Sequence, residues 1–204
     1  MRLYFVRHGE STANRLGEFS NCGFKHPLTE TGIQQANTLA RKLSSVPVER
    51  IYSSPLMRAV QTAQVLAEAL RAPVVVTEAL REWSVGIYEG TSATSGWEIH
   101  RRVQEDWFVR GQYDSKMPGG ESFVEIRERF VPFIEELVKA GRHSDQAIVL
   151  VGHGGLYLVM LPVICNNISV AVASSRGVPY SSYIVVETRP DGMSCVSWCG
   201  TSMV

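Results

Sequence analysis

Strand-length apolar segments alternate with helix-length amphipathic segments along most of this chain. Leu3–Val6 and Ala147–Val151 are short and continuously apolar, which is typical of strands buried on both faces. Four further strands are expected, at Arg50–Ser53, Pro73–Thr77, Ser181–Glu187 and Met193–Cys199. The alternation predicts an α/β fold, a three-layer sandwich whose mainly parallel central sheet is flanked by helices on both faces.

The expected helices begin at residues that commonly cap or open a helix. Ser122 and Glu125 have the spacing of a capping box, ahead of a helix that runs to Gly141 and that Pro132 is expected to kink or divide. A second helix is expected from Thr29 or Thr31 to about Ser44, and Thr31 and Gln34 have the spacing of a second capping box. A third is expected to run to Leu70 with Pro55 in its first turn, and a fourth from Gly154 to about Ile164.

The stretch from Gly86 to Gly120 differs from the rest, because glycines and aromatic residues interrupt it repeatedly. It is expected to hold a helix around Trp97–Val109. We expect one domain over residues 1–204, with residues 86–120 as an insertion or lid over the carboxyl-terminal edge of the sheet. Four aromatic side chains either line a pocket or, as their helical spacing favours, belong to the core: Trp97, Trp107, Phe108 and Tyr113.

Charge and hydropathy limit the expected partners. The 20 basic residues balance 20 acidic residues, so no general affinity for nucleic acid or for an anionic membrane is expected. The start lacks the pattern of a signal peptide and no apolar run approaches a membrane span, which favours a cytoplasmic protein. Cys195 and Cys199 lie on an expected strand, which favours structural thiols over a zinc site.

Four expected strands are each followed by a side chain that can take part in catalysis. Arg7 and His8 follow the first strand, Arg58 the second, Glu82 the third and His153 the buried fourth. Alone, each of these residues has an ordinary structural interpretation. The exits of parallel strands meet at one edge of a sheet, however, so the five side chains are expected to converge. Guanidinium groups, imidazoles and the amides of a helix start suit a phosphoryl group.

These residues also resemble the motifs of a known family, the histidine phosphatase superfamily, whose fold is also called phosphoglycerate-mutase-like. The resemblance covers roughly residues 1–190 and is carried, in order, by Arg7-His8-Gly9-Glu10, by Arg58 in Ser-Pro-Leu-Met-Arg-Ala, by Glu82 in Leu-Arg-Glu, by Pro118-Gly119-Gly120-Glu121-Ser122 and by His153 in Gly-His-Gly-Gly. Each motif is weak alone, but the ordered set is specific.

The resemblance implies a role for each catalytic residue. His8 is the expected nucleophile that becomes phosphohistidine, with its other ring nitrogen donating to a backbone carbonyl. Arg7 and Arg58 are expected to hold the transferring oxygens. Glu82 is expected to protonate the leaving alcohol and then to act as base for the hydrolytic water. His153 is expected to donate a hydrogen bond from the far side of the phosphoryl group.

The resemblance further implies a set of phosphate-binding residues. Asn14, Ser20 and the amide of Gly154 are expected to join Arg7, Arg58 and His153 around the phosphate. Asn21 stands where many relatives have glycine, which weakens the expectation of a backbone contact there. Ser11 is a weaker candidate that caps the loop. No metal and no other cofactor are expected, because the arginines and His153 supply the positive charge.

The family contains both phosphatases and phosphoglycerate mutases, and the sequence favours a phosphomonoesterase. The segment Trp83–Gly96 contains no lysine or arginine to hold the carboxylate of a glycerate. Arg101, Arg102 and Arg110 keep a mutase as an alternative, and a catalytically silent phosphate-binding protein is a third. The expected partner is a small phosphate monoester of undetermined identity. The apolar region Met160–Val172 either packs internally or forms the face of a homodimer.

Overall fold

A mixed sheet forms the centre of the computed structural model, which describes residues 1–141 and 146–203. Within these residues seven strands follow the order β3-β2-β4-β1-β5-β6-β7. Their bounds are β1 Arg2–Arg7, β2 Val48–Ser53, β3 Val74–Val76, β4 Ala147–Gly152, β5 Tyr183–Arg189, β6 Gly192–Trp198 and β7 Thr201–Ser202. The first four in this order are parallel, and β5, β6 and β7 are antiparallel to their neighbours. The expected parallel centre is confirmed.

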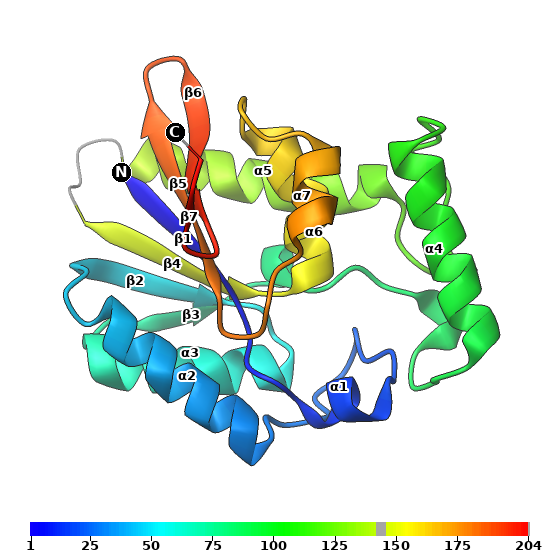
Figure 1. Cartoon of the computed structure of the whole chain (residues 1–204), viewed down its shortest axis with the longest axis horizontal. Helices are drawn as coiled ribbons and strands as arrows, with labels where there is room; N and C mark the ends of the chain where they lie inside the picture. Colours follow the sequence, from blue (N-terminus) through cyan, green and yellow to red (C-terminus); the bar gives the residue numbers. More distant parts are fainter. Residues whose placement is uncertain (142–145, 204) are drawn as a thin grey trace.

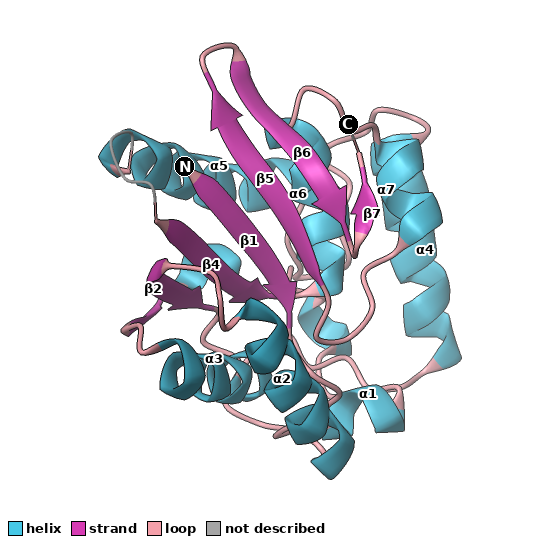
Figure 2. Cartoon of the chain, turned by 60° about the vertical axis from the view of Figure 1, so that its left-hand side comes forward, coloured by secondary structure: helices cyan, strands magenta, loops and turns pink. Residues whose placement is uncertain are grey.

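Helices cover both faces of this sheet, as the three-layer prediction requires. Figures 1 and 2 show α2 and α3 against one face and α5 and α6 against the other. The helices are α1 Thr12–Leu16, α2 Glu30–Leu43, α3 Met57–Leu70, α4 Thr94–Phe108, α5 Phe123–Ala140, α6 Gly154–Ile164 and α7 Val170–Arg176, with short 3-10 turns at η1 Glu78–Leu80 and η2 Gly86–Tyr88. No helix in the described part of the chain is long and apolar enough to cross a membrane.

The apolar run of β1 serves two separate cores. Leu3 and Phe5 pack into the cluster that includes α5 and α6, whereas Tyr4 and Val6 pack into the cluster that includes α2 and α3. Successive side chains of a strand point to opposite faces, so a strand covered on both sides needs apolar residues at every position. This explains the uninterrupted run in the sequence.

Two expected helix starts are corrected by the structure. Helix α2 is capped by Thr29, whose side chain accepts a hydrogen bond from the amide of Gly32. Thr31 therefore lies inside the helix, and its capping-box pairing with Gln34 was wrong. Helix α3 begins at Met57, so Pro55 precedes the helix rather than lying in its first turn.

The start of α5 matches its prediction more closely. Ser122 and Glu125 form the expected capping box, and the helix runs to the residue before Gly141. Pro132 lies inside the helix without dividing it. A proline removes one backbone hydrogen bond from a helix interior. The buried side chains of Phe130 and Ile134, on either side of it in sequence, hold the segment against the sheet.

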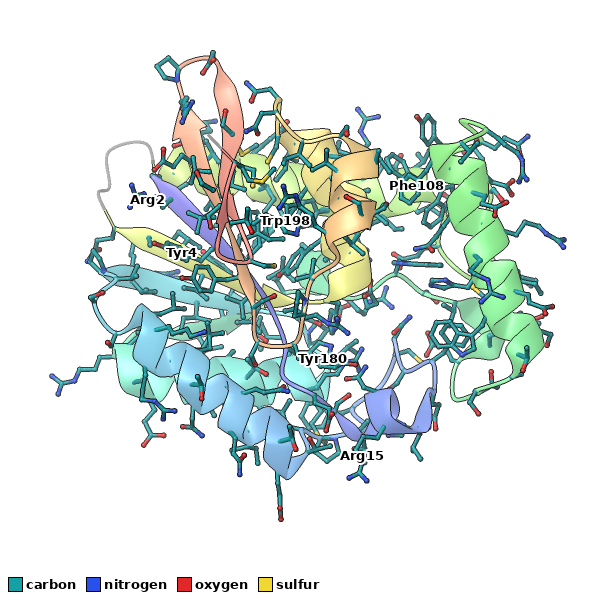
Figure 3. All side chains as sticks on the ribbon, in the orientation of Figure 1. Arg2, Tyr4, Arg15, Phe108, Tyr180 and Trp198 are labelled. Carbon is teal, nitrogen blue, oxygen red and sulfur yellow. The ribbon has the colours of Figure 1, made fainter. Side chains whose placement is uncertain are left out.

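Helix α4 stands beyond the carboxyl ends of the parallel strands, at the right of Figure 1. The expected insertion over this edge of the sheet is thus found. Trp107 is 1% exposed and belongs to the core, whereas Tyr113 is 48% exposed. Phe108, labelled in Figure 3, packs at the margin of the same core from α4. The four aromatic residues therefore do not share one role, and Trp97 is considered with the site.

The remaining apolar segments pack largely inside the fold. In the region Met160–Val172, the side chains of Met160, Leu161, Ile164 and Ile168 are buried. Cys195 is buried on β6, and Cys199 follows that strand. Both observations agree with the structural interpretation of these segments.

Candidate active site

The five side chains predicted from the strand exits come together at the carboxyl edge of the sheet. Four of them, Arg7, His8, Arg58 and Glu82, line one cavity of about 240 Å³. His153 lies behind Arg58, 1% exposed, and does not line this cavity. A larger cavity, of about 560 Å³, lies at the opposite end of the sheet and contains none of these residues.

The ring of His8 is held in one tautomer. Its Nδ1 lies 2.6 Å from the carbonyl oxygen of Gly9, which can only accept, so Nδ1 carries the proton and donates. Nε2 accepts a hydrogen bond of 3.1 Å from Nε of Arg58. Burial and the charges of Arg58 and Arg7 hold the pKa of His8 well below its ordinary value. His8 is therefore a neutral imidazole whose basic nitrogen is Nε2, the form that a nucleophile needs.

Arg58 connects three parts of the site. Besides the bond to His8, its Nη1 donates to the carbonyl oxygen of Ser20 at 2.7 Å, and its Nη2 lies 3.4 Å from Nδ1 of His153. The side chain is 4% exposed, and burial lowers its pKa to about 10. Arg58 thus remains charged at neutral pH and presents a fixed fork of donors to the cavity.

His153 is also held as a neutral ring. Because Nδ1 faces the Arg58 donor, Nε2 carries the proton and donates to Oγ of Ser54 at 2.7 Å. Burial and the neighbouring charge of Arg58 lower the pKa of His153 well below its ordinary value. The expected donation from His153 to a phosphoryl oxygen therefore requires a second proton on Nδ1, which the negative charge of a bound phosphate favours.

Arg7 is oriented by two residues that sequence reasoning missed. Its Nη1 donates to the carbonyl oxygen of Val178 at 2.6 Å, and its guanidinium carbon lies 4.0 Å from the centre of the Tyr180 ring. Tyr180, labelled in Figure 3, lies at the edge of the sheet that faces α1 and α4. The Nε of Arg7 is buried and has no hydrogen-bond partner among the described residues. The only signal of Tyr180 in the sequence was its position in the loop before β5.

We expect Tyr180→Ala to lower kcat/KM for p-nitrophenyl phosphate by about tenfold, because a cation–π contact that orients Arg7 is lost. Tyr180→Phe keeps the ring and should stay within about threefold of the native enzyme. Steady-state kinetics of both variants provide the measurement. Equal losses in the two variants would assign the effect to the hydroxyl group and contradict this role of the ring.

Glu82 is fixed by two backbone amides at the cavity wall. Its Oε1 accepts from the amide of Trp83 at 3.1 Å, and its Oε2 from the amide of Gly155 at 2.9 Å. A Cβ atom at Gly155 would lie 2.8 Å from Oε2, so only glycine allows this approach. Burial raises the pKa of the Glu82 carboxyl. A raised pKa increases the share of the protonated form near neutral pH, as a proton donor requires.

The expected phosphate-binding residues Asn14, Ser20 and Gly154 all line the cavity, together with Asn21. Oδ1 of Asn14 accepts from the amide and hydroxyl of Ser11, so its amide nitrogen is the end that remains for a ligand. Ser11 thus caps α1, as expected for the weaker candidate. The side chain of Asn21 is engaged, since its Nδ2 donates to the carbonyl oxygen of Trp83.

Several other side chains line the cavity. Of these, sequence reasoning considered only Trp97 for a pocket and did not assign Phe19, His100 or Glu18 to the site. Trp97 stacks on Phe19 with ring centres 4.0 Å apart, and His100 stacks on Trp83 at 4.4 Å. Glu18 also lines the cavity. The three basic candidates for a carboxylate clamp do not: Arg101, Arg102 and Arg110 are exposed. In addition, Arg110 pairs with Glu105 and Asp106.

The buried His8 and His153 and the half-buried His100 give an expected pH dependence of stability. Burial lowers the pKa of His8 and His153 well below the ordinary value and that of His100 to about 4. Below about pH 6.5 the unfolded chain binds protons on these rings that the folded chain does not. The free energy of unfolding should therefore rise with pH from about 5 to 6.5 and level off above about 7.

Urea unfolding at a series of pH values measures this slope. Each fully titrating histidine contributes about 1.4 kcal/mol per pH unit. Glu82, whose pKa is raised by burial, acts with the opposite sign and reduces the slope. A free energy of unfolding that stays flat or falls between pH 5 and 6.5 would show that these rings are not held neutral.

Comparison with known proteins agrees with this geometry. The pattern of the histidine phosphatase superfamily (branch 1) matches residues 3–201. A protein of Arabidopsis thaliana named metal-independent phosphoserine phosphatase is 30% identical over 98% of this chain and 82% of its own. A protein of Proteus mirabilis named a probable phosphoglycerate mutase is 33% identical over 76% and 70% of the two chains. The solved structure of a mycobacterial glucosyl-3-phosphoglycerate phosphatase superposes with a TM-score of 0.78 at 26% identity, covering 98% and 99%.

Proposed function

The chain belongs to the histidine phosphatase superfamily, and from this premise we propose that it is a phosphomonoesterase that hydrolyses a small phosphorylated metabolite without a metal. The observation that carries this proposal is the state of His8. Its basic Nε2 belongs to a buried, neutral ring at the wall of a cavity that Arg7, Arg58 and Glu82 also line. A neutral nucleophile, two fixed cations and a carboxyl group of raised pKa form a complete set for phosphoryl transfer.

The first step is attack of His8 Nε2 on phosphorus. A P–N bond forms while the ester P–O bond breaks, and the leaving oxygen takes a proton from Glu82. For this step the hydrogen bond from Arg58 to His8 is exchanged for one from Arg58 to a phosphoryl oxygen. Arg7 and Arg58 stabilise the negative charge on the transferring oxygens, which is the larger part of catalysis in phosphoryl transfer.

The second step is hydrolysis of phosphohistidine. Glu82, now ionised, removes a proton from water as its oxygen attacks phosphorus, and the P–N bond breaks to release inorganic phosphate and neutral His8. Asn14, Ser20 and the amide of Gly154 bind the phosphoryl oxygens in both steps. His153 does not line the cavity and acts through Arg58, because its Nδ1 faces Nη2 of that residue and helps to hold the guanidinium in place.

Hydrolysis is preferred to a mutase reaction because of what lines the cavity. A mutase must hold the whole of its substrate and exclude water until the phosphoryl group returns to it. Within the described residues, the arginines at this cavity are Arg7 and Arg58, both assigned to the phosphate, and no lysine lines it. A glycerate carboxylate has no cationic partner there.

Phosphate release from a panel of phosphomonoesters in excess EDTA tests the proposal. We expect turnover that EDTA leaves unchanged, because the arginines provide the charge that a metal ion would otherwise supply. Loss of turnover in EDTA with recovery on adding magnesium would contradict it. Interconversion of 2- and 3-phosphoglycerate without phosphate release would make the chain a mutase, and phosphate binding without any turnover would make it a silent binding protein.

A further inference from the structure

The cavity has two chemically distinct ends. Its phosphoryl end is formed by Arg7, His8, Arg58, Glu82 and Gly154. The rings of Phe19, Trp97 and His100 also line the cavity and contact one another, and Glu18 lines it next to Phe19 in sequence. We call these four residues the outer end and place the alcohol part of a substrate against them. With a volume of about 240 Å³, the cavity suits a small alcohol part that contacts these side chains.

The outer end carries no positive charge among the described lining residues. Its one acid, Glu18, lies 2.9 Å from Nε2 of His26. The rings of Phe19 and Trp97 offer no donor to an anion, since Nε1 of Trp97 already donates to the carbonyl oxygen of Gly17. A carboxylate placed there would lose hydration without gaining a cation, and it would face the Glu18 carboxylate. An uncharged alcohol meets no such cost.

His100 supplies the polar contact at this end. Its ring is sandwiched among aromatic neighbours, 4.4 Å from the Trp83 ring and 5.4 Å from that of Trp97. Neither ring nitrogen has a hydrogen-bond partner among the described residues. Burial, followed by the charge of Arg101, lowers its pKa to about 4, so the ring is neutral. A neutral imidazole offers one donor and one acceptor, and a hydroxyl group satisfies either.

We propose that the substrate is a phosphate monoester of a small, uncharged alcohol with a further hydroxyl group, and that His100 recognises this hydroxyl. The proposal rests on the proposed phosphatase function and specifies its substrate class. It places an uncharged alcohol above one that carries only a carboxylate, since the described lining of the outer end holds no cation. It also makes His100 a specificity residue, because it acts on the alcohol part rather than on the phosphate.

Three esters with the same three-carbon skeleton test the substrate class. Glycerol 3-phosphate has the hydroxyl groups, n-propyl phosphate lacks them, and 3-phosphoglycerate carries a carboxylate in place of one. We expect kcat/KM for glycerol 3-phosphate to exceed that for each of the others by about tenfold, since a site that hydrogen-bonds a hydroxyl group rejects analogues that lack it. Hydrolysis of 3-phosphoglycerate or phosphoserine at a rate equal to or above that of glycerol 3-phosphate would overturn the proposal.

The variant His100→Phe tests the residue while keeping an aromatic ring against Trp83. It should lower kcat/KM for glycerol 3-phosphate by about tenfold and leave n-propyl phosphate within about twofold. Arg102→Ala, exposed on the same helix, is the matched control and should change neither. Equal effects of His100→Phe on both esters would contradict recognition of a hydroxyl. If the native protein hydrolyses no ester at all, both the proposed phosphatase function and this inference are contradicted. If it hydrolyses esters without the expected preference, only this inference is contradicted.

Discussion

Replacement of His8 by alanine is expected to abolish phosphate release, with kcat falling by at least about 10⁴-fold. The substitution removes the nitrogen that forms the bond to phosphorus, and the other imidazole that lines the cavity, His100, belongs to its outer end. His153, the nearest other imidazole at 5.0 Å between ring centres, lies outside the cavity and its Nδ1 faces Arg58. It does not take over the attack.

Binding of inorganic phosphate provides the control for His8→Ala. Arg7 and Arg58 remain in the variant, so phosphate should still bind, which shows that the site is folded while the chemistry is lost. Calorimetry of phosphate binding and single-turnover kinetics measure the two properties separately. Retention of more than about a tenth of the native kcat would contradict the assignment of His8 as nucleophile.

Glu82→Gln is expected to have the second largest effect, and the effect should depend on the leaving group. For an alkyl phosphate, kcat should fall by about 10²–10⁴-fold, because glutamine cannot protonate a departing alkoxide. For p-nitrophenyl phosphate the leaving group needs no proton, so the first step should proceed. Release of p-nitrophenol should then show a burst followed by a slow steady state, since the water that cleaves phosphohistidine has lost its base.

Glu78→Gln is the matched control for this variant. Glu78 lies four residues earlier, its side chain is 72% exposed and it pairs with Arg81 at the surface. Its replacement should change neither the steady state nor the burst. An equal loss for both esters without a burst would show that Glu82 only shapes the site and transfers no proton.

The arrangement of the principal site residues was predictable because it follows from sheet geometry. Each of Arg7, His8, Glu82 and His153 comes at or after the end of a parallel strand, and such ends share one edge whatever the details of packing. The buried strands were predictable for a similar reason, since a strand covered on both faces must be apolar throughout.

Residues outside this regular framework were not predictable. Tyr180 comes from the loop before β5 and His100 from the insertion, so their approach to Arg7 and to the cavity depends on tertiary packing that leaves no periodic signal. The same holds for the position of His153 behind Arg58, which depends on the hydroxyl of Ser54. Helices α1 and α7, of five and seven residues, are too short to show an amphipathic repeat.

The most direct test of the account is to trap the covalent intermediate. Glu82→Gln is mixed with p-nitrophenyl phosphate, quenched in alkali within the burst and digested, and the phosphorylated peptide is sequenced by mass spectrometry. The account predicts phosphate on a ring nitrogen of His8, stable in alkali and lost in acid. A burst with phosphate on any other residue, or turnover of the native enzyme with no protein-bound phosphate at any time, would contradict it.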